Sequence, residues 1–153
     1  MLVLCPFIFI NTGEHGDTQF PLFSAARVGP TPILDWKKQD GSRIQQDQLD
    51  KIGLDVKNAA YKIIEGKGAT NYAIGVTAAE LASAILKDSN SVLPVSRVLE
   101  SYHGISGVAI SVPTVVNRTG AAFNVEVPMT DAEIAKLRAS AAAVQASLAS
   151  LGY

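Results

Sequence analysis

Three β-type segments follow one another so closely in the second half of the chain that they limit its topology. Residues 91–99, 107–116 and 123–127 are rich in β-branched and apolar side chains, and turns at 103–104 and 117–120 separate them. Parallel pairing needs a crossover of a dozen or more residues, and these connections are shorter. The spacing therefore predicts an antiparallel sheet.

Two helices are predicted to precede this sheet. Apolar residues recur at three- and four-residue steps from Leu49 to Ile64, which is typical of an amphipathic helix and predicts an end near Gly66. A second helix is expected from about 71 to 87. Because it is alanine-rich and apolar nearly all round, we expect it to be largely buried.

The final helix has the clearest start signal. Thr130 and Glu133 form a capping box, and the apolar positions that follow predict a long helix that ends at Gly152. Together with the sheet, this predicts an α+β fold in which antiparallel strands pack against long helices.

The segments between 19 and 48 are less regular. Residues 19–28 suit a strand, ended by the turn residues of 29–32. Residues 33–38 are expected to form a short helix that carries Trp36. The polar stretch 37–48 is expected to be an exposed surface segment.

A single histidine stands in the most unusual stretch, residues 13–17, which reads Gly-Glu-His-Gly-Asp. It follows the apolar run 2–10, which is predicted to be a buried strand. The glycines allow a sharp turn, so His15 would lie at a strand end where it can meet a ligand. Because imidazole exchanges protons near neutral pH, His15 is a candidate proton-transfer residue. An isolated histidine can also be purely structural.

Glu14, His15 and Asp17 could also form a metal site. The chain has only one other histidine and one cysteine, so a nitrogen and sulfur ligand set is hard to complete. Neighbouring strand residues also point to opposite faces, which separates Glu14 from His15. We therefore expect no metal.

Composition limits the classes of protein to which this chain can belong. The 153 residues are 48% hydrophobic and 18% charged, with a net charge of −1, which predicts one globular domain and no nucleic-acid partner. Cys5 is the only cysteine, so no intramolecular disulfide is expected and a cytoplasmic setting fits. The apolar run 1–10 is too short to span a bilayer, and no membrane association is expected.

Several other residues have ordinary structural interpretations. Trp36 and Tyr72 are expected to be packing aromatics, and His103 an exposed turn residue. Asp131 and Glu133 suit the dipole at the start of the last helix and are not expected to be a catalytic carboxylate pair.

Three collinear blocks resemble the L-lactate/malate dehydrogenase superfamily. Residues 13–21 resemble its catalytic-histidine segment, 58–75 the helix-turn-helix of its substrate pocket, and 90–96 with 112–120 its strand pair. The resemblance divides the chain into residues 1–11, an apolar N-terminal strand that matches poorly, and residues 12–153, which are similar to the C-terminal catalytic domain of bacterial members. It implies a truncated chain.

The resemblance also implies roles for individual residues. His15 would be the acid/base at the C2 oxygen of a small 2-hydroxy or 2-oxo acid, and lactate is favoured over malate. Thr70 would contact the substrate, and Ile74 would pack against the nicotinamide of NAD. The family further implies a homo-oligomer, or association with a nucleotide-binding half.

The sequence departs from the family pattern in ways that affect activity. It lacks the Gly-x-Gly-x-x-Gly turn of a dinucleotide-binding domain, since residues 66–68 connect two helices. It also lacks the substrate-binding arginines and the aspartate that orients the histidine, because Arg27, Arg43 and Arg118 stand in no matching motif. Ile8 replaces the histidine of allosteric members, so no sugar-phosphate effector site is expected.

Three functions remain open from the sequence. The chain could be a dehydrogenase half with little activity alone, or a catalytic half that works with a separate nucleotide-binding chain. It could instead be a non-catalytic remnant that keeps only the fold and the oligomerisation surfaces.

Overall fold

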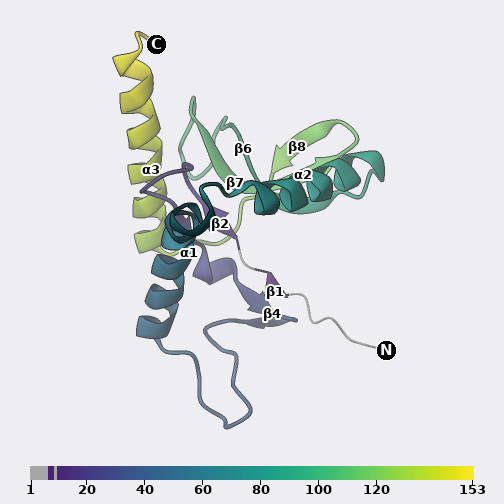
Figure 1. The fold of residues 1–153 in the computed structure, drawn as a ribbon, viewed down its shortest axis with the longest axis vertical. Helices are drawn as coiled ribbons and strands as arrows, with labels where there is room; N and C mark the ends of the chain where they lie inside the picture. The colour runs from purple at the N-terminus through teal and green to yellow at the C-terminus, as the bar shows by residue number, and fades with distance from the viewer. Residues whose placement is uncertain (1–6, 9) are drawn as a thin grey trace.

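The computed structural model describes residues 7–8 and 10–153, and its centre is an antiparallel sheet (Figure 1). Strands β6 (Ser91–Val98), β7 (Ala109–Asn117) and β8 (Gly120–Asn124) pair in that order, with β7 in the middle. The predicted antiparallel sheet is confirmed. Strand β8 starts three residues earlier than predicted, because residues 118–119 alone make the turn and Gly120 takes a positive φ of 92°.

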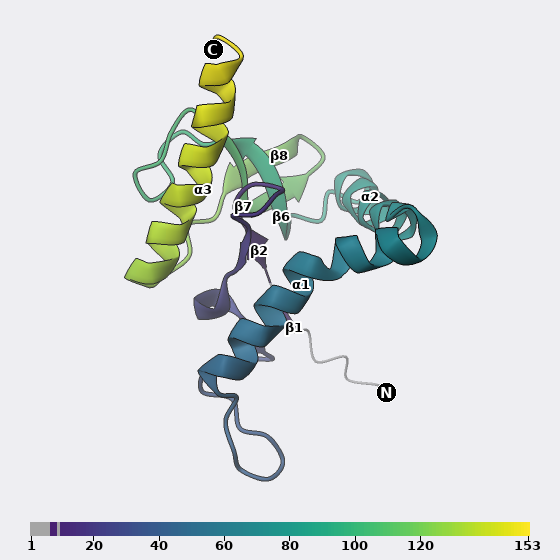
Figure 2. The ribbon, with the colours of Figure 1, turned by 60° about the vertical axis from the view of Figure 1, so that its left-hand side comes forward.

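The described part of the chain has three α-helices (Figure 2). They are α1 (Gln46–Lys67), α2 (Asn71–Leu86) and α3 (Asp131–Ser150). Helices α2 and α3 contact β7 of this sheet, and α1 contacts the N-terminal strand β3 (Phe20–Pro21). Helix α1 ends where Gly68 adopts the left-handed conformation, with φ 83°. All three predicted helices are present within one or two residues of their expected bounds.

The main core lies between α3, β7 and the chain that leads into the sheet. Strand β7 is buried from Val112 to Val116, and Leu137 and Ala141 of α3 face it. Since α3 places residues three and four apart on one face, these two positions lie in one stripe. The buried residues of this core are Ile10, Phe20, Leu22, Leu99, Tyr102, Ile105, Val108, Ile110, Val112, Leu137 and Ala141.

The N-terminal third is built from very short strands. Strands β1 (Phe7–Ile8), β4 (Arg27–Val28) and β5 (Thr31–Pro32) form one small sheet, and β2 (Asn11–Thr12) pairs with β3 (Phe20–Pro21). Of the strand predicted over 2–10, residues 2–6 and 9 lie outside the described residues. Within the rest, only Phe7–Ile8 is strand.

The single strand predicted over 19–28 is wrong. A 3₁₀-helix, η1 (Phe23–Ala25), separates β3 from β4. The physical reason is a long-range contact, because the Ser24 N–H donates to the Glu133 carboxylate of α3 at 3.1 Å and not to a neighbouring strand. The contact partner lies more than a hundred residues away in sequence.

The short helix predicted over 33–38 is also wrong. The N–H groups of Asp35 and Trp36 both donate to the Pro32 carbonyl at 3.0 Å, which makes one turn. The turn does not continue, because the Lys38 N–H donates to the Ser42 carbonyl at 2.8 Å and closes a loop instead. The rest of the stretch 37–48 is mostly exposed, as predicted.

Helix α2 is not buried, contrary to the prediction. Every residue from 71 to 80 is exposed, and only Ala84 of the helix is buried. Tyr72, predicted to be a packing aromatic, is 78% exposed and lies beneath the ammonium of Lys67. An apolar helix is buried only when neighbours cover all its faces. In this structure, the rest of the chain covers only the last turns of α2.

His103 also differs from its prediction as an exposed turn residue. Its φ of 47° turns the ring back onto the segment that follows β8. There Nε2 lies 3.1 Å from the Val127 carbonyl and Nδ1 lies 3.6 Å from the Glu126 carboxylate. The side chain is 14% exposed, so this histidine is a partly buried structural group.

Glu133 joins α3 to η1 through its carboxylate. The carboxylate accepts hydrogen bonds from the N–H of Thr130 at 2.8 Å and from Ser24, which completes the predicted capping box. Burial by itself would raise the pKa of Glu133, but these donors outweigh burial and hold the pKa below its ordinary value. Asp131 in the same turn is exposed, at the N-terminus of α3 where its charge suits the helix dipole.

Truncation of Leu137 should destabilise the domain strongly. Its side chain is fully buried, so Leu137→Ala removes contacts and leaves a cavity. We expect the free energy of unfolding to fall by about 2–5 kcal/mol in urea titrations. Leu151→Ala is the control, because Leu151 is 73% exposed and should change stability by less than about 0.5 kcal/mol. Equal losses in both variants would contradict this assignment of the core.

The capping role of Glu133 should appear in the pH dependence of stability. A lowered folded pKa gives stabilisation that is full above the ordinary value of 4.5 and is lost as the pH falls through the folded value. Glu133→Gln should therefore lower the melting temperature at neutral pH and flatten its decline in acid. Thermal denaturation of both proteins across this range is the measurement, and identical acid slopes would rule out the role.

Candidate active site around His15

The turn that carries His15 is attached to the middle strand of the sheet. The N–H of Gly13 donates to the Ser111 carbonyl at 2.9 Å, and the Ser111 N–H donates to the Gly13 carbonyl at 2.8 Å. The Thr12 hydroxyl adds a third hydrogen bond to the Ser111 carbonyl at 3.1 Å. Because β7 belongs to the main core, the start of the turn is held by the most buried part of the fold.

Helix α3 contacts the same turn from another side. The N–H of Glu14 donates to the Ser140 hydroxyl at 2.6 Å, and Ser140 is fully buried. Gly13 has φ 103°, and a Cβ at this position would lie 2.7 Å from the Ser140 Oγ. Both the backbone angle and the close approach of α3 therefore require glycine before Glu14.

The acidic neighbours of His15 are engaged elsewhere. The Glu14 carboxylate accepts hydrogen bonds from the N–H of Thr18 at 3.1 Å and from its hydroxyl at 2.7 Å. Asp17 lies 3.4 Å from the Lys57 ammonium of α1. Among the described residues, no group of three or more histidine, cysteine, aspartate or glutamate side chains could hold a metal ion.

His15 itself is exposed and lines a cavity of about 710 Å³, which we call the His15 cavity. Its imidazole has no hydrogen-bond partner in the part of the chain that the structure describes. The cavity combines polar and apolar groups from β2, α2, β6, β7 and α3. The other lining residues are Asn11, Thr12, Gly13, Glu14, Gln19, Thr77, Pro94, Ser96, Ala109, Ser111 and Val144.

The two other predicted site residues lie on α2 but do not line this cavity. Thr70 is at the N-cap of α2 and is partly buried, and Ile74 one turn later is 60% exposed. Thr77, which the sequence interpretation missed, is the α2 residue that lines the cavity with His15. Its three-residue spacing from Ile74 could have indicated a shared helix face.

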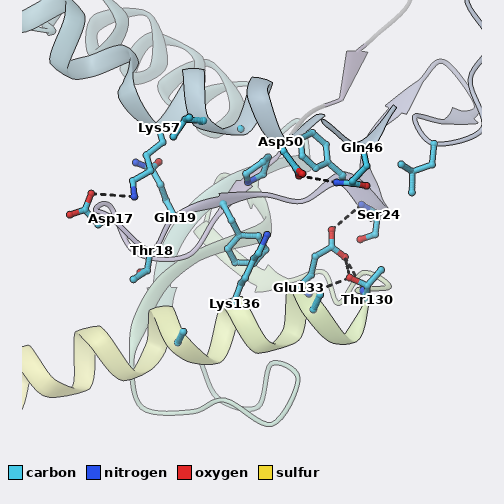
Figure 3. A pocket seen from close by; sticks show the side chains of 18 residues that line it. Asp17, Thr18, Gln19, Ser24, Gln46, Asp50, Lys57, Thr130, Glu133 and Lys136 are labelled. Atoms are coloured by element: carbon cyan, nitrogen blue, oxygen red, sulfur yellow. Dashed lines mark hydrogen bonds and ion pairs between the residues drawn. The ribbon is translucent and has the colours of Figure 1, made fainter. Parts of the chain in front are cut away.

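A second cavity of about 690 Å³ lies between α1 and α3, on the other side of the turn (Figure 3). Its floor includes Phe20 and Pro21, and its ionisable groups are largely paired, as in Asp17 with Lys57. Glu133 at one end is occupied by its capping contacts. The described acids that line this cavity all accept hydrogen bonds or an ion pair, and the Lys136 ammonium lies 5.9 Å from the centre of the Phe20 ring. The His15 cavity is therefore the better catalytic candidate.

The arrangement around His15 supports proton transfer. An exposed imidazole stands on a turn whose backbone is fixed by β7 and α3, and hydroxyl and amide groups share the cavity with it. Such a group can donate a proton to, or accept one from, a small polar molecule that enters the cavity.

No helix in the described part of the chain is both long and apolar enough to cross a membrane.

Comparisons with known proteins identify relatives of this chain. Residues 10–151 match the model of the lactate/malate dehydrogenase, alpha/beta C-terminal domain. The chain is 46% identical to the L-lactate dehydrogenase of Bifidobacterium animalis subsp. lactis over 142 residues, which cover 92% of this chain and 44% of that protein. It is 44% identical to L-lactate dehydrogenase 1 of Enterococcus faecalis, over 87% of this chain and 40% of that protein.

Solved structures give the same result. The fold matches a lactate dehydrogenase from a Medee basin deep-sea metagenome library with a TM-score of 0.87 and 33% identity, over 95% of this chain and 46% of that one. It matches malate dehydrogenase from Salinibacter ruber with a TM-score of 0.85 and 30% identity, again over 95% and 46%. The chain thus spans less than half the length of these relatives. By family model, relatives and fold together, it belongs to the lactate/malate dehydrogenase family, as the C-terminal α/β domain.

Proposed function

We propose that this chain is the substrate-side half of an NAD-dependent L-lactate dehydrogenase, with His15 as its acid/base. The observation that carries the proposal is the exposed imidazole on a turn held from two sides, facing the His15 cavity. The relatives named above are L-lactate dehydrogenases, which favours the interconversion of lactate and pyruvate. His15 would hold the proton that moves to or from the C2 oxygen of the substrate.

The residues of this chain fit only the nicotinamide end of the cofactor. In the described residues, no glycine-rich turn leads from a strand into a helix, and Gly66 and Gly68 connect two helices instead. Ile74 offers an exposed apolar side chain one turn from Thr70, which suits a flat ring and a substrate beside it. When bound, NAD would supply the hydride acceptor or donor.

The exposed helices support a partner that carries the nucleotide site. Large apolar side chains of α1 and α2 face solvent, among them Ile64, Tyr72, Ile74 and Val76. Contiguous apolar exposure of this kind marks an interaction surface. We propose that a nucleotide-binding half covers the α1–α2 surface and completes the active site with the arginine and aspartate residues that this chain lacks.

A second candidate function is an oligomerisation module without catalysis. It is favoured by the same α1–α2 surface and by the alternate exposed residues of edge strand β6, such as Val92 and Val98. A second copy of the chain would then cover these faces. The two functions differ in whether the assembled protein reduces pyruvate.

Activity should therefore require a second component. The purified chain alone should neither bind NADH in calorimetry nor oxidise it with pyruvate. Mixed with the separately produced N-terminal half of the Bifidobacterium relative, it should oxidise NADH, followed at the nicotinamide absorbance. His15→Asn should reduce that rate by roughly 10²–10⁴-fold, the usual contribution of a general acid/base.

Two results would count against this function. Activity of the chain alone would show that it holds its own cofactor site. An inactive mixture in which the two halves demonstrably bind would favour the oligomerisation module. Circular dichroism of the His15→Asn variant provides the control for folding.

Binding of the nucleotide half should depend on α2. Val76 is 70% exposed, so Val76→Asp should not unfold the chain but should weaken the association at least tenfold by placing a charge in the contact. Leu151→Asp is the matched control, because Leu151 is similarly exposed but lies at the far end of α3. Titration calorimetry of both variants is the measurement, and equal affinities would show that α2 is not the contact surface.

A further inference from the structure

Ser140 occupies a position on α3 where an apolar residue is expected. Its neighbours Leu137 and Ala141 belong to the main core, and Ser140 itself is fully buried. A buried hydroxyl is costly unless it is hydrogen-bonded. In the described residues its partners are the N–H of Glu14 at 2.6 Å and the hydroxyl of Thr18 at 3.0 Å, both from the turn that carries His15.

These contacts close a ring of hydrogen bonds beside His15. The Glu14 N–H reaches the Ser140 hydroxyl, which contacts the Thr18 hydroxyl, which in turn donates to the Glu14 carboxylate at 2.7 Å. The Thr18 N–H donates to the same carboxylate oxygen at 3.1 Å. The ring therefore joins the residue before His15 to the residue three positions after it, and attaches both to α3.

This hydrogen-bonded ring matters because it fixes the backbone on either side of His15. No described residue is hydrogen-bonded to the His15 imidazole, so the direction of the imidazole is set by the backbone of the turn. Gly13 is fixed to β7 on one side, and Glu14 is fixed to α3 on the other. A catalytic group must stay close to its productive geometry, and small displacements reduce the rate steeply.

We infer that Thr18 and Ser140 are positioning residues for His15: their hydroxyl pair holds the Glu14 peptide so that the imidazole enters the His15 cavity. The inference deepens the proposed function and rests on it for its catalytic consequence. The positioning of the imidazole involves only residues of this chain. It can therefore be tested with or without activity.

The first test uses amide hydrogen exchange and NMR on the isolated chain. Thr18→Val removes the hydroxyl, whereas Thr18→Ser keeps it. We expect exchange at the Glu14 amide to accelerate about tenfold in Thr18→Val, as for the loss of one hydrogen bond, and to stay within about twofold in Thr18→Ser. The imidazole signals of His15 should shift in Thr18→Val, while those of His103, the other histidine, should not move.

Ser140→Ala should have the same effect as Thr18→Val. Ser147→Ala is its matched control, because Ser147 is an exposed serine of α3 whose hydroxyl donates only to the Ala143 carbonyl of the same helix. Exchange at the core amide of Val112 reports global stability in every variant. Acceleration at Glu14 with Val112 unchanged supports local positioning, whereas equal acceleration at both overturns it.

The second test uses the active mixture of the two halves. Thr18→Val should lower kcat about tenfold and leave the KM for pyruvate within about twofold, and Thr18→Ser should restore kcat. A fall in kcat that Thr18→Ser shares overturns the inference. If the wild-type mixture is inactive, the proposed function fails. The positioning is then decided by the exchange and imidazole measurements, and unchanged signals in Thr18→Val overturn it.

Discussion

The pairing of β7 is the interaction on which the rest of the structure depends. This strand is hydrogen-bonded to β6 and β8, packs against Leu137 of α3, and bonds through Ser111 to the turn that carries His15. A central strand with both edges paired and a buried run from Val112 to Val116 resists local opening. The candidate catalytic turn is thus attached to the part of the fold that is hardest to displace.

The α1–α2 hairpin, unlike β7, is mostly exposed to solvent. It is well formed, with a capping box at Gln45 and a glycine C-cap at Gly68, yet most of its apolar side chains remain in water. Each such side chain forgoes the free energy that burial would supply. The α1–α2 hairpin therefore presents a large apolar surface to solvent.

The candidate site was only partly predictable from sequence. His15 could be identified from its glycine-flanked turn and from the family resemblance, and that resemblance also indicated Thr70 and Ile74. Ser111 and Ser140 could not, because their hydrogen bonds with the turn join residues about a hundred positions apart or more. No local pattern records such contacts. The same limit explains the wrong strand at 19–28, where the decisive partner of Ser24 is Glu133.

The sequence by itself determined the elements whose signals are local. Hydrophobic period, the Thr130 capping box and the short turns between strands predicted α1, α3 and the antiparallel sheet, because these depend on residues a few positions apart. Only the tertiary structure decided what covers each element. Composition made α2 look buried, and the fold leaves it exposed, since burial depends on neighbours that no helical pattern contains.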